Sequence, residues 1–270
     1  MSVRFWGVRG GIPAPGEETL KFGGNTSCLE IRFRNDQIDE TFVIDCGTGS
    51  RELGRDMMGR APVRMRLLFT DYRWDHIQGF PFFTPVYIPS SEIHVYGPKH
   101  GDLGVREMLA AQMKFPVFPI QLEHLNAKFS FHDLKPGESF DAGVISVRTV
   151  EAPGGSVGYR LEGLGKAVVC LPDSVRGALP AATLAAFCRK ASVIVFNSAV
   201  CGTLNGKRPA ATRGVWEDAV AIARAAKAKK LAIFHHAPDD DDKTLLALER
   251  RAKRAFPGTL AAYEGLRLSF

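Results

Sequence analysis

The chain has 270 residues, of which 45% are hydrophobic and 24% are charged. These fractions are close to the average of globular proteins, so they exclude wholesale disorder. The formal net charge is +6, and the two basic clusters, Lys227–Lys230 and Arg250–Arg254, are expected at helix ends rather than in a nucleic-acid-binding patch.

The first half of the chain alternates short apolar runs with glycine-rich turns and two helical patterns. Runs rich in Val, Ile and Phe predict strands at Ser2–Trp6, Ser27–Phe33, Glu40–Asp45, Met65–Thr70 and Glu92–Tyr96. Helices are expected at Arg51–Gly59 and Val105–Met113.

The second half also contains both strands and helices, and it ends with helices. Strands are predicted at Val144–Glu151, Gly158–Leu161, Ala167–Cys170, Ser192–Phe196 and Lys230–Phe234. Helices are predicted at Leu184–Lys190, Trp216–Lys229 and Asp241–Phe256. This order favours two sheets packed face to face with helices outside, a four-layer α/β sandwich. We expect one domain over residues 1–270, since the chain shows no linker and no internal repeat.

The five cysteines form no C-x-x-C pair, and the N-terminus lacks the apolar core of a signal peptide. No apolar run approaches the roughly 20 residues that cross a bilayer. These features favour a cytoplasmic protein with reduced thiols and no membrane association. A homodimer is the default expectation for its assembly.

Polar clusters directly follow four of the predicted strands. They are Asp71–His76, Pro153–Gly155, Asp173 and the pair His235-His236. Ligand-binding groups in layered α/β folds commonly lie at the carboxyl ends of strands, so these four endings can converge on one cleft.

Asp75, His76, Asp173 and His235 together supply two carboxylates and two imidazoles, a donor set that suits zinc, iron or manganese. Taken singly, each residue has a structural alternative. A lone buried histidine is often only hydrogen-bonded, and a lone aspartate often caps a turn. The site hypothesis therefore depends on the whole set.

Several short motifs in register resemble one family. They are Gly7–Pro13, Gly23–Cys28, Ile44–Gly54, Trp74–Phe83, Pro153–Gly155 and Phe234–Pro238. The chain from about Ser2 to Asp242 resembles the metallo-β-lactamase superfamily, in particular its phosphodiesterase-like branch with tRNase Z and the phosphonate-pathway cyclic phosphodiesterase. The resemblance implies an αββα sandwich and, in the family, a two-metal hydrolase site.

The chain departs from the family pattern at three metal-ligand positions. The family motif H-x-H-x-D-H reads Asp71-Tyr-Arg73-Trp-Asp75-His76 here, and the histidine before Pro-Gly-Gly is replaced by Ala152. By resemblance, the lost positions Asp71, Arg73 and Ala152 belong to the first metal.

The other family ligands are present. By resemblance, Asp75, His76 and His235 bind the second metal and Asp173 bridges the two, with His236 as the alternative to His235. The family's general-acid histidine falls at Ala210. We therefore expect one divalent metal, zinc before iron or manganese, or none.

Arg73 carries a charge that it cannot lose inside a protein, so we expect it to occupy the first-metal position and pair with Asp173 or Asp71. The alternative is that Arg73 extends into solvent. Asp45, Asp71 and Asn25 are expected to support the ligands by hydrogen bonds or to tie neighbouring loops together.

Two functions remain open from the sequence. The first is a single-metal hydrolase of a phosphodiester or ester, with Asp75 and Arg73 in catalytic roles. The second is a catalytically inactive family member, a binding or regulatory domain. Its partner would be a small anionic ligand or a phosphodiester, nucleic acid is not indicated, and two-metal hydrolysis is not expected.

Overall fold

The computed structural model describes residues 1–59, 62–135, 137–175, 179–198 and 215–270, without the side chain of Asp173. Its strands form two seven-stranded sheets within the described residues. The first has the order β14-β1-β2-β3-β4-β5-β6: Arg267–Ser269, Ser2–Gly7, Cys28–Arg34, Asp39–Ile44, Arg64–Leu68, Glu92–Pro98 and Lys128–Leu134. The second has the order β13-β12-β11-β10-β9-β8-β7: Thr259–Ala261, Leu231–Phe234, Val193–Asn197, Lys166–Leu171, Ser156–Gly163, Ile145–Ala152 and Ser139–Ala142.

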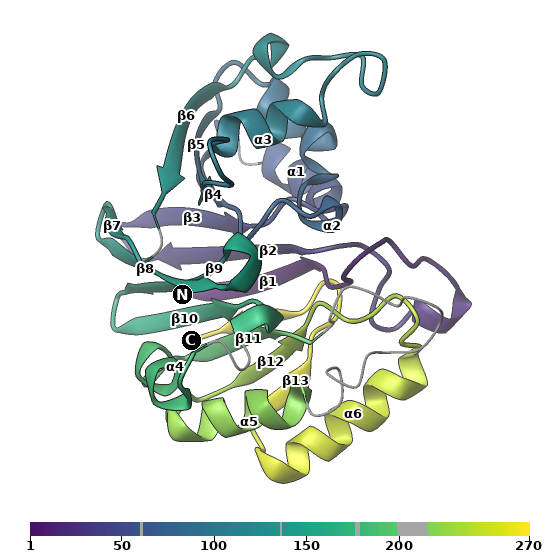
Figure 1. Cartoon of the computed structure of the whole chain (residues 1–270), viewed down its shortest axis with the longest axis vertical. Helices are drawn as coiled ribbons and strands as arrows, with labels where there is room; N and C mark the ends of the chain where they lie inside the picture. Colours follow the sequence, from purple (N-terminus) through teal and green to yellow (C-terminus); the bar gives the residue numbers. More distant parts are fainter. Residues whose placement is uncertain (60–61, 136, 176–178, 199–214) are drawn as a thin grey trace.

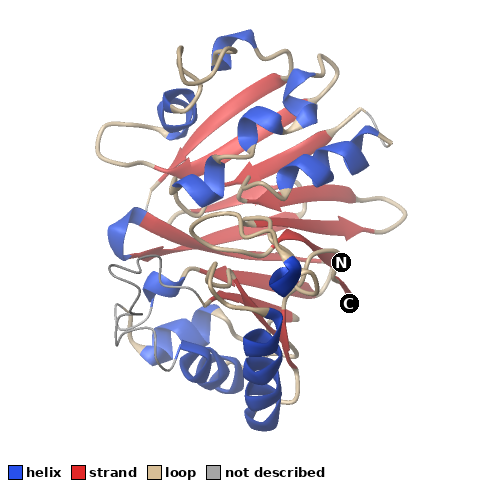
Figure 2. Cartoon of the chain, turned by 90° about the vertical axis from the view of Figure 1, so that its right-hand side faces the viewer, coloured by secondary structure: helices blue, strands red, loops and turns tan. Residues whose placement is uncertain are grey.

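Helices cover the outer face of each sheet (Figures 1 and 2). On the first sheet lie α1 (Ser50–Met58) and α3 (Val105–Ala111), and on the second lie α4 (Ala181–Phe187), α5 (Val215–Ala225) and α6 (Asp242–Ala255). One apolar cluster joins the two sheets, and two others join each sheet to its own helices. Three apolar interfaces define four layers, so the predicted αββα sandwich is confirmed.

The central strands are parallel, and their carboxyl ends align. In the second sheet the register pairs Leu171 with Phe196 and Asn197 with Phe234. In the first sheet β3 pairs in parallel with β4 through Ile44 and Leu68. Because such strands are buried on both faces, they read as continuous apolar runs and end abruptly where polar residues begin. The polar clusters that follow them therefore lie at one edge of each sheet.

The predicted strands are all present, with ends shifted by one or two residues. The predicted boundaries of two helices were wrong. The helix predicted over Leu184–Lys190 lies earlier, and the helix predicted over Trp216–Lys229 ends at Ala225. Lys190 and Lys227 follow these helices with φ of 53° and 52°, a left-handed conformation that stops a helix.

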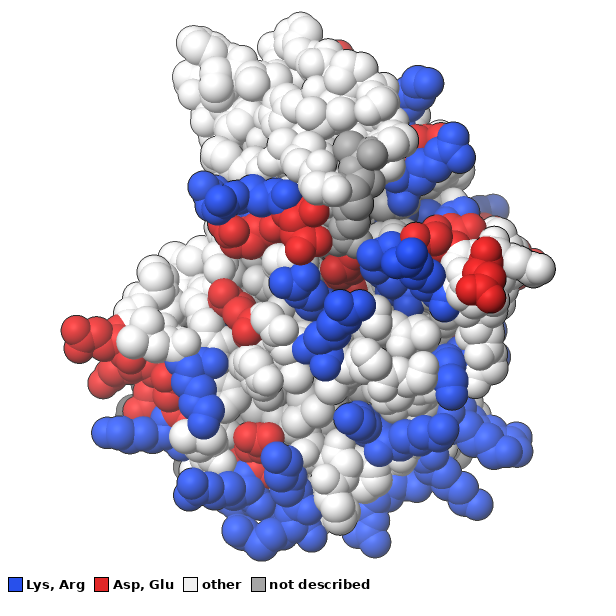
Figure 3. All heavy atoms as spheres, turned by 180° about the vertical axis from the view of Figure 1, so that it is seen from behind, with Lys and Arg blue, Asp and Glu red and all other residues white. Residues whose placement is uncertain are grey.

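The surface charge is uneven (Figure 3). On the face that Figure 3 shows, Lys and Arg side chains gather at the lower end, over the second sheet and its helices, whereas the upper end is largely uncharged. Lys253 and Arg254 occupy the last turn of α6, where cations favour the helix dipole. In the described part of the chain no helix has the length and apolar character to cross a membrane. Cys28, Cys46, Cys170 and Cys188 are buried and free, and Cys201 lies outside the described residues.

Candidate metal centre

Three potential ligands come from two distant segments. Asp75 and His76 lie on α2 (Trp74–Ile77), a single turn that follows β4, and His235 directly follows β12. His235 adopts φ of 59°, a conformation that costs a non-glycine residue free energy and marks positions held by their surroundings. All three side chains are buried, with His76 and His235 fully inaccessible.

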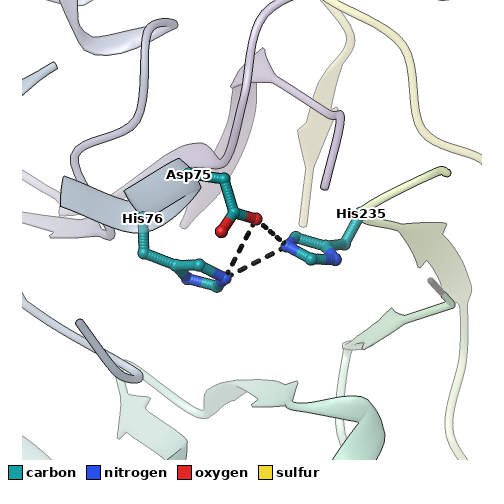
Figure 4. Close-up of side chains that lie close together, drawn as sticks. All are labelled: Asp75, His76 and His235. Atoms are coloured by element: carbon teal, nitrogen blue, oxygen red, sulfur yellow. Dashed lines mark hydrogen bonds and ion pairs between the residues drawn. The ribbon is translucent and has the colours of Figure 1, made fainter. Parts of the chain in front are cut away.

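The donor atoms of these residues converge on one point (Figure 4). His235 Nε2 lies 2.8 Å from Asp75 Oδ2 and 3.1 Å from His76 Nε2, and His76 Nε2 lies 3.4 Å from the same carboxylate oxygen. Ligands around a tetrahedral zinc at 2.0–2.1 Å are themselves separated by about 3.3 Å. Among the described residues this is the candidate metal cluster, and its donor types and spacing fit a divalent metal.

Hydrogen bonds at Nδ1, the ring nitrogen that faces away from the other two ligands, fix the orientation of His76. Its Nδ1 donates to Asp45 Oδ2 at 2.7 Å and lies 3.0 Å from the hydroxyl of Thr70. Asp45 also accepts hydrogen bonds from the Ser27 hydroxyl and from the backbone and side chain of Thr70. A carboxylate on one imidazole nitrogen directs the lone pair of the other toward the metal position. Asp45 thus contacts His76 directly, as its expected supporting role requires.

The loop Gly10-Gly11 closes over the other two ligands. The backbone N–H of Gly11 donates to Asp75 Oδ2 at 2.7 Å. A Cβ at position 10 would lie 2.3 Å from Nδ1 and Cε1 of His235, so the ring lies against backbone where a side chain cannot fit. The sequence alone assigns no site role to these glycines, because no local pattern shows which distant ring packs on them.

Charge within the cluster perturbs two ionisations. Burial disfavours the charged form of His76, but Asp45, Asp71 and Asp75 outweigh burial and raise the pKa of His76 to about 10. Burial also opposes ionisation of Asp75, yet the hydrogen bond from His235 and the charge of His76 hold its pKa below the usual range. Without a metal, a proton on His76 balances these carboxylates, so protons and metal compete for the site.

His236 serves the fold. Its Nε2 donates to the carbonyl oxygen of Ala262 at 2.8 Å, and its ring packs edge-on against Phe22. Burial is the main cause that lowers the pKa of His236 to about 3. The structure therefore brings His235, and not its neighbour, to Asp75 and His76.

Comparison with known proteins gives the family. The family model for the beta-lactamase superfamily domain matches residues 40–236, which is most of the chain. The chain belongs to the beta-lactamase superfamily. Comparison with curated protein sequences gave no match.

Solved structures of other proteins share the fold. Human tRNase Z, short form, is 17% identical with a TM-score of 0.64, covering 100% of this chain and 99% of its own. A diphosphatase from the PhnP family is 15% identical with a TM-score of 0.64, covering 100% and 97%. Zn(2+)-bound PqqB from Methylobacterium extorquens is 15% identical with a TM-score of 0.63, covering 100% of both chains. At these identities the likeness establishes the fold.

Two of the positions that the resemblance assigns to a first metal, Asp71 and Arg73, form an ion pair. Asp71 accepts from the backbone N–H of Arg73 at 3.0 Å and from its Nε at 2.9 Å, and Arg73 Nη2 lies 2.8 Å from the same carboxylate. The Ser156 hydroxyl adds a longer contact to Asp71 of 3.4 Å. Ala152 is buried at the end of β8 and offers no donor side chain. Of the two partners expected for Arg73, Asp71 is in contact.

Three other sequence expectations have different outcomes. Asn25 contacts Glu264 through both its side-chain and backbone N–H, at 3.0 and 2.6 Å, and its carbonyl accepts from Val8 and Arg9. Asn25 therefore ties loops together at a distance from the ligands. Asp173 begins the short turn after β10, but its side chain lies outside the described part of the structure, as does Ala210.

Proposed function

We propose that this chain binds one divalent metal, zinc before iron or manganese, and uses it to hydrolyse a phosphodiester or an ester. The observation that carries the proposal is the convergence of Asp75 Oδ2, His76 Nε2 and His235 Nε2 within 2.8–3.4 Å of one another. Three protein ligands are fewer than a divalent metal binds, so positions remain for Asp173 and for substrate or water. Asp173 is proposed as a further ligand from its place after β10.

The surrounding residues support this assignment. Asp45 orients His76, and the Gly11 N–H fixes the carboxylate of Asp75. When bound, such a metal acts as a Lewis acid that polarises a substrate oxygen and activates water. Among the structural neighbours, one is a diphosphatase and another is zinc-bound. These neighbours support metal-dependent hydrolysis as the class of reaction.

Arg73 is the cation proposed for the place of the first metal. Because it is paired with Asp71, it stabilises developing charge less than a second divalent ion would. The same ion pair favours the second candidate function, a family member that binds a ligand without turning it over. The two functions differ in whether a bound metal supports turnover.

The first test is the metal content of protein purified without chelator. We expect one equivalent of metal in the wild-type chain, lost in His235→Ala and kept in His94→Ala, a half-exposed histidine of β5 that serves as control. Two equivalents would contradict the single-metal site, and no metal after incubation with zinc would contradict metal binding. Turnover of bis(p-nitrophenyl) phosphate or p-nitrophenyl acetate that depends on His235 supports the hydrolase. One bound metal with turnover of neither compound supports the binding domain.

A further inference from the structure

A pocket of about 430 Å³ opens beside the Asp71–Arg73 pair. Its described lining is mostly apolar or glycine: the ring of Tyr72, Pro98, Met108 of α3 and the turn Pro153–Gly155. Pockets of this volume hold small molecules. The pocket reaches the metal centre through Asp71, whose Oδ1 lies 3.7 Å from Nδ1 of His76.

Tyr72 presents its ring rather than its hydroxyl. The hydroxyl donates to the carbonyl oxygen of Pro98 at 2.7 Å, and the ring packs against Phe69 with centroids 6.0 Å apart. A Cβ at Gly97 would lie 2.3 Å from this hydroxyl, so Tyr72 is held close against β5. A ligand in the pocket therefore meets an apolar surface at this residue.

The charged groups of the pocket already compensate one another. Arg73 Nε and Nη2 contact Oδ2 of Asp71, and the Ser156 hydroxyl also faces that oxygen. An anionic ligand would have to lie beside a carboxylate that is nearly buried, which costs free energy in a region of low dielectric. His100, the other ionisable group of the described lining, is exposed to water. The pocket thus favours an uncharged ligand.

One polar group in the lining has no partner. The hydroxyl of Ser174 is buried and forms no hydrogen bond in the described structure. A buried hydroxyl without a partner is costly, and a carbonyl oxygen is an uncharged acceptor that would satisfy it. This hydroxyl therefore points to a ligand with a carbonyl group.

We propose that this pocket binds the uncharged, apolar acyl part of a carboxylic ester, whose carbonyl oxygen accepts a hydrogen bond from Ser174. The inference rests on the proposed hydrolase function and selects neutral esters over phosphodiesters. The reaction adds water across the acyl C–O bond. That bond breaks, a C–O bond to the water oxygen forms, and the alcohol leaves with a proton.

The test combines turnover with binding. The p-nitrophenyl esters of acetate, butyrate and hexanoate are compared with bis(p-nitrophenyl) phosphate, and binding of the non-hydrolysed amide hexananilide is measured by calorimetry. Each methylene that enters the pocket raises kcat/KM about fourfold. Met108→Trp fills the pocket, so it should remove this chain-length dependence and weaken hexananilide binding at least tenfold. Met58→Trp, at a half-buried methionine of α1, is the matched control and should change neither quantity. Ser174→Ala should weaken hexananilide binding about fivefold, the loss of one hydrogen bond.

The outcomes separate this inference from the proposed function. Preference for the phosphodiester over the hexanoate ester, or hexananilide binding that Met108→Trp leaves unchanged, would overturn the inference. A protein that binds hexananilide through Met108 and yet hydrolyses no ester with any divalent metal would keep the assigned ligand class and refute the hydrolase. Metal content is measured in every variant, so that a change in binding cannot come from an emptied metal centre.

Discussion

Replacing Gly10 by alanine should damage metal binding through His235 alone. The new Cβ would lie 2.3 Å from Nδ1 and Cε1 of His235, where 3.4 Å is the shortest ordinary contact. The ring must therefore move by roughly 1 Å, several times the tolerance of about 0.2 Å for a metal–ligand distance. His235 cannot simply rotate, because its Nε2 is hydrogen-bonded to Asp75 at 2.8 Å. We expect zinc affinity to fall by about 100-fold, at the upper end of effects seen for supporting residues.

The assay is competition with a chromophoric zinc chelator at neutral pH, alongside thermal unfolding of the metal-free protein. Overpacking alone is expected to cost about 1–3 kcal/mol of stability. Gly16→Ala in the same loop is the matched control, because a Cβ there meets no atom within 4 Å and the backbone is extended. Wild-type zinc affinity in a folded Gly10→Ala protein would show that His235 is not a ligand.

Three further changes test the surroundings of the ligands. Asp45→Asn removes the acceptor behind His76 and should weaken zinc binding about 10- to 100-fold in the same competition assay, with one equivalent still bound at saturation. The triple change Asp71→His, Arg73→His and Ala152→His restores the family's first-metal ligands and should raise the metal content to two equivalents. A triple variant that folds and still binds one would contradict the assignment of these positions. The metal-free protein should lose stability as pH rises from about 6.5 toward 10, by roughly 1.4 kcal/mol per pH unit, because folding raises the pKa of His76 to about 10. Denaturant midpoints at several pH values measure this loss, and the zinc-loaded protein should not show it.

The centre of the fold could be predicted from the sequence, and its edges could not. β11 and β12 are buried along their whole length, so they read as uninterrupted apolar runs. The strands that went unpredicted are β6, β7, β13 and β14, the four edge strands of the two sheets. Edge strands pair on one side only, and they are often short or polar. β14 has three residues, and all positions of β6 except Leu134 are exposed or half-buried.

The site residues, too, could be predicted only in part from the sequence. Asp75, His76 and His235 could be found because each follows a buried strand, and the fold brings such ends together. Gly10 could not be found, because its role is a contact with a ring that only the fold places beside it. Of the two roles expected for Asn25, support of the ligands or tying loops together, the structure shows the second, but the partner Glu264 lies near the other end of the chain and could not be named from the motif. Short-range patterns thus identify residues that end strands, whereas contacts between loops depend on the assembled sheets.

Charge balance among the described side chains supports the proposal that a divalent ion binds here. His76 lies among three carboxylates, 2.7 Å from Asp45, 3.7 Å from Asp71 and 3.4 Å from Asp75. Arg73 compensates one of these charges, and a protonated His76 compensates another, which leaves one negative charge unbalanced in a buried cluster. A single divalent ion beside a neutral His76 brings these described groups to zero. Asp173, which is proposed as a further ligand, would add a fourth carboxylate and leave the one-metal cluster with a single negative charge. The pairing of Arg73 with Asp71 is consistent with the proposal of one bound metal, because the guanidinium supplies part of the positive charge that a second ion would bring.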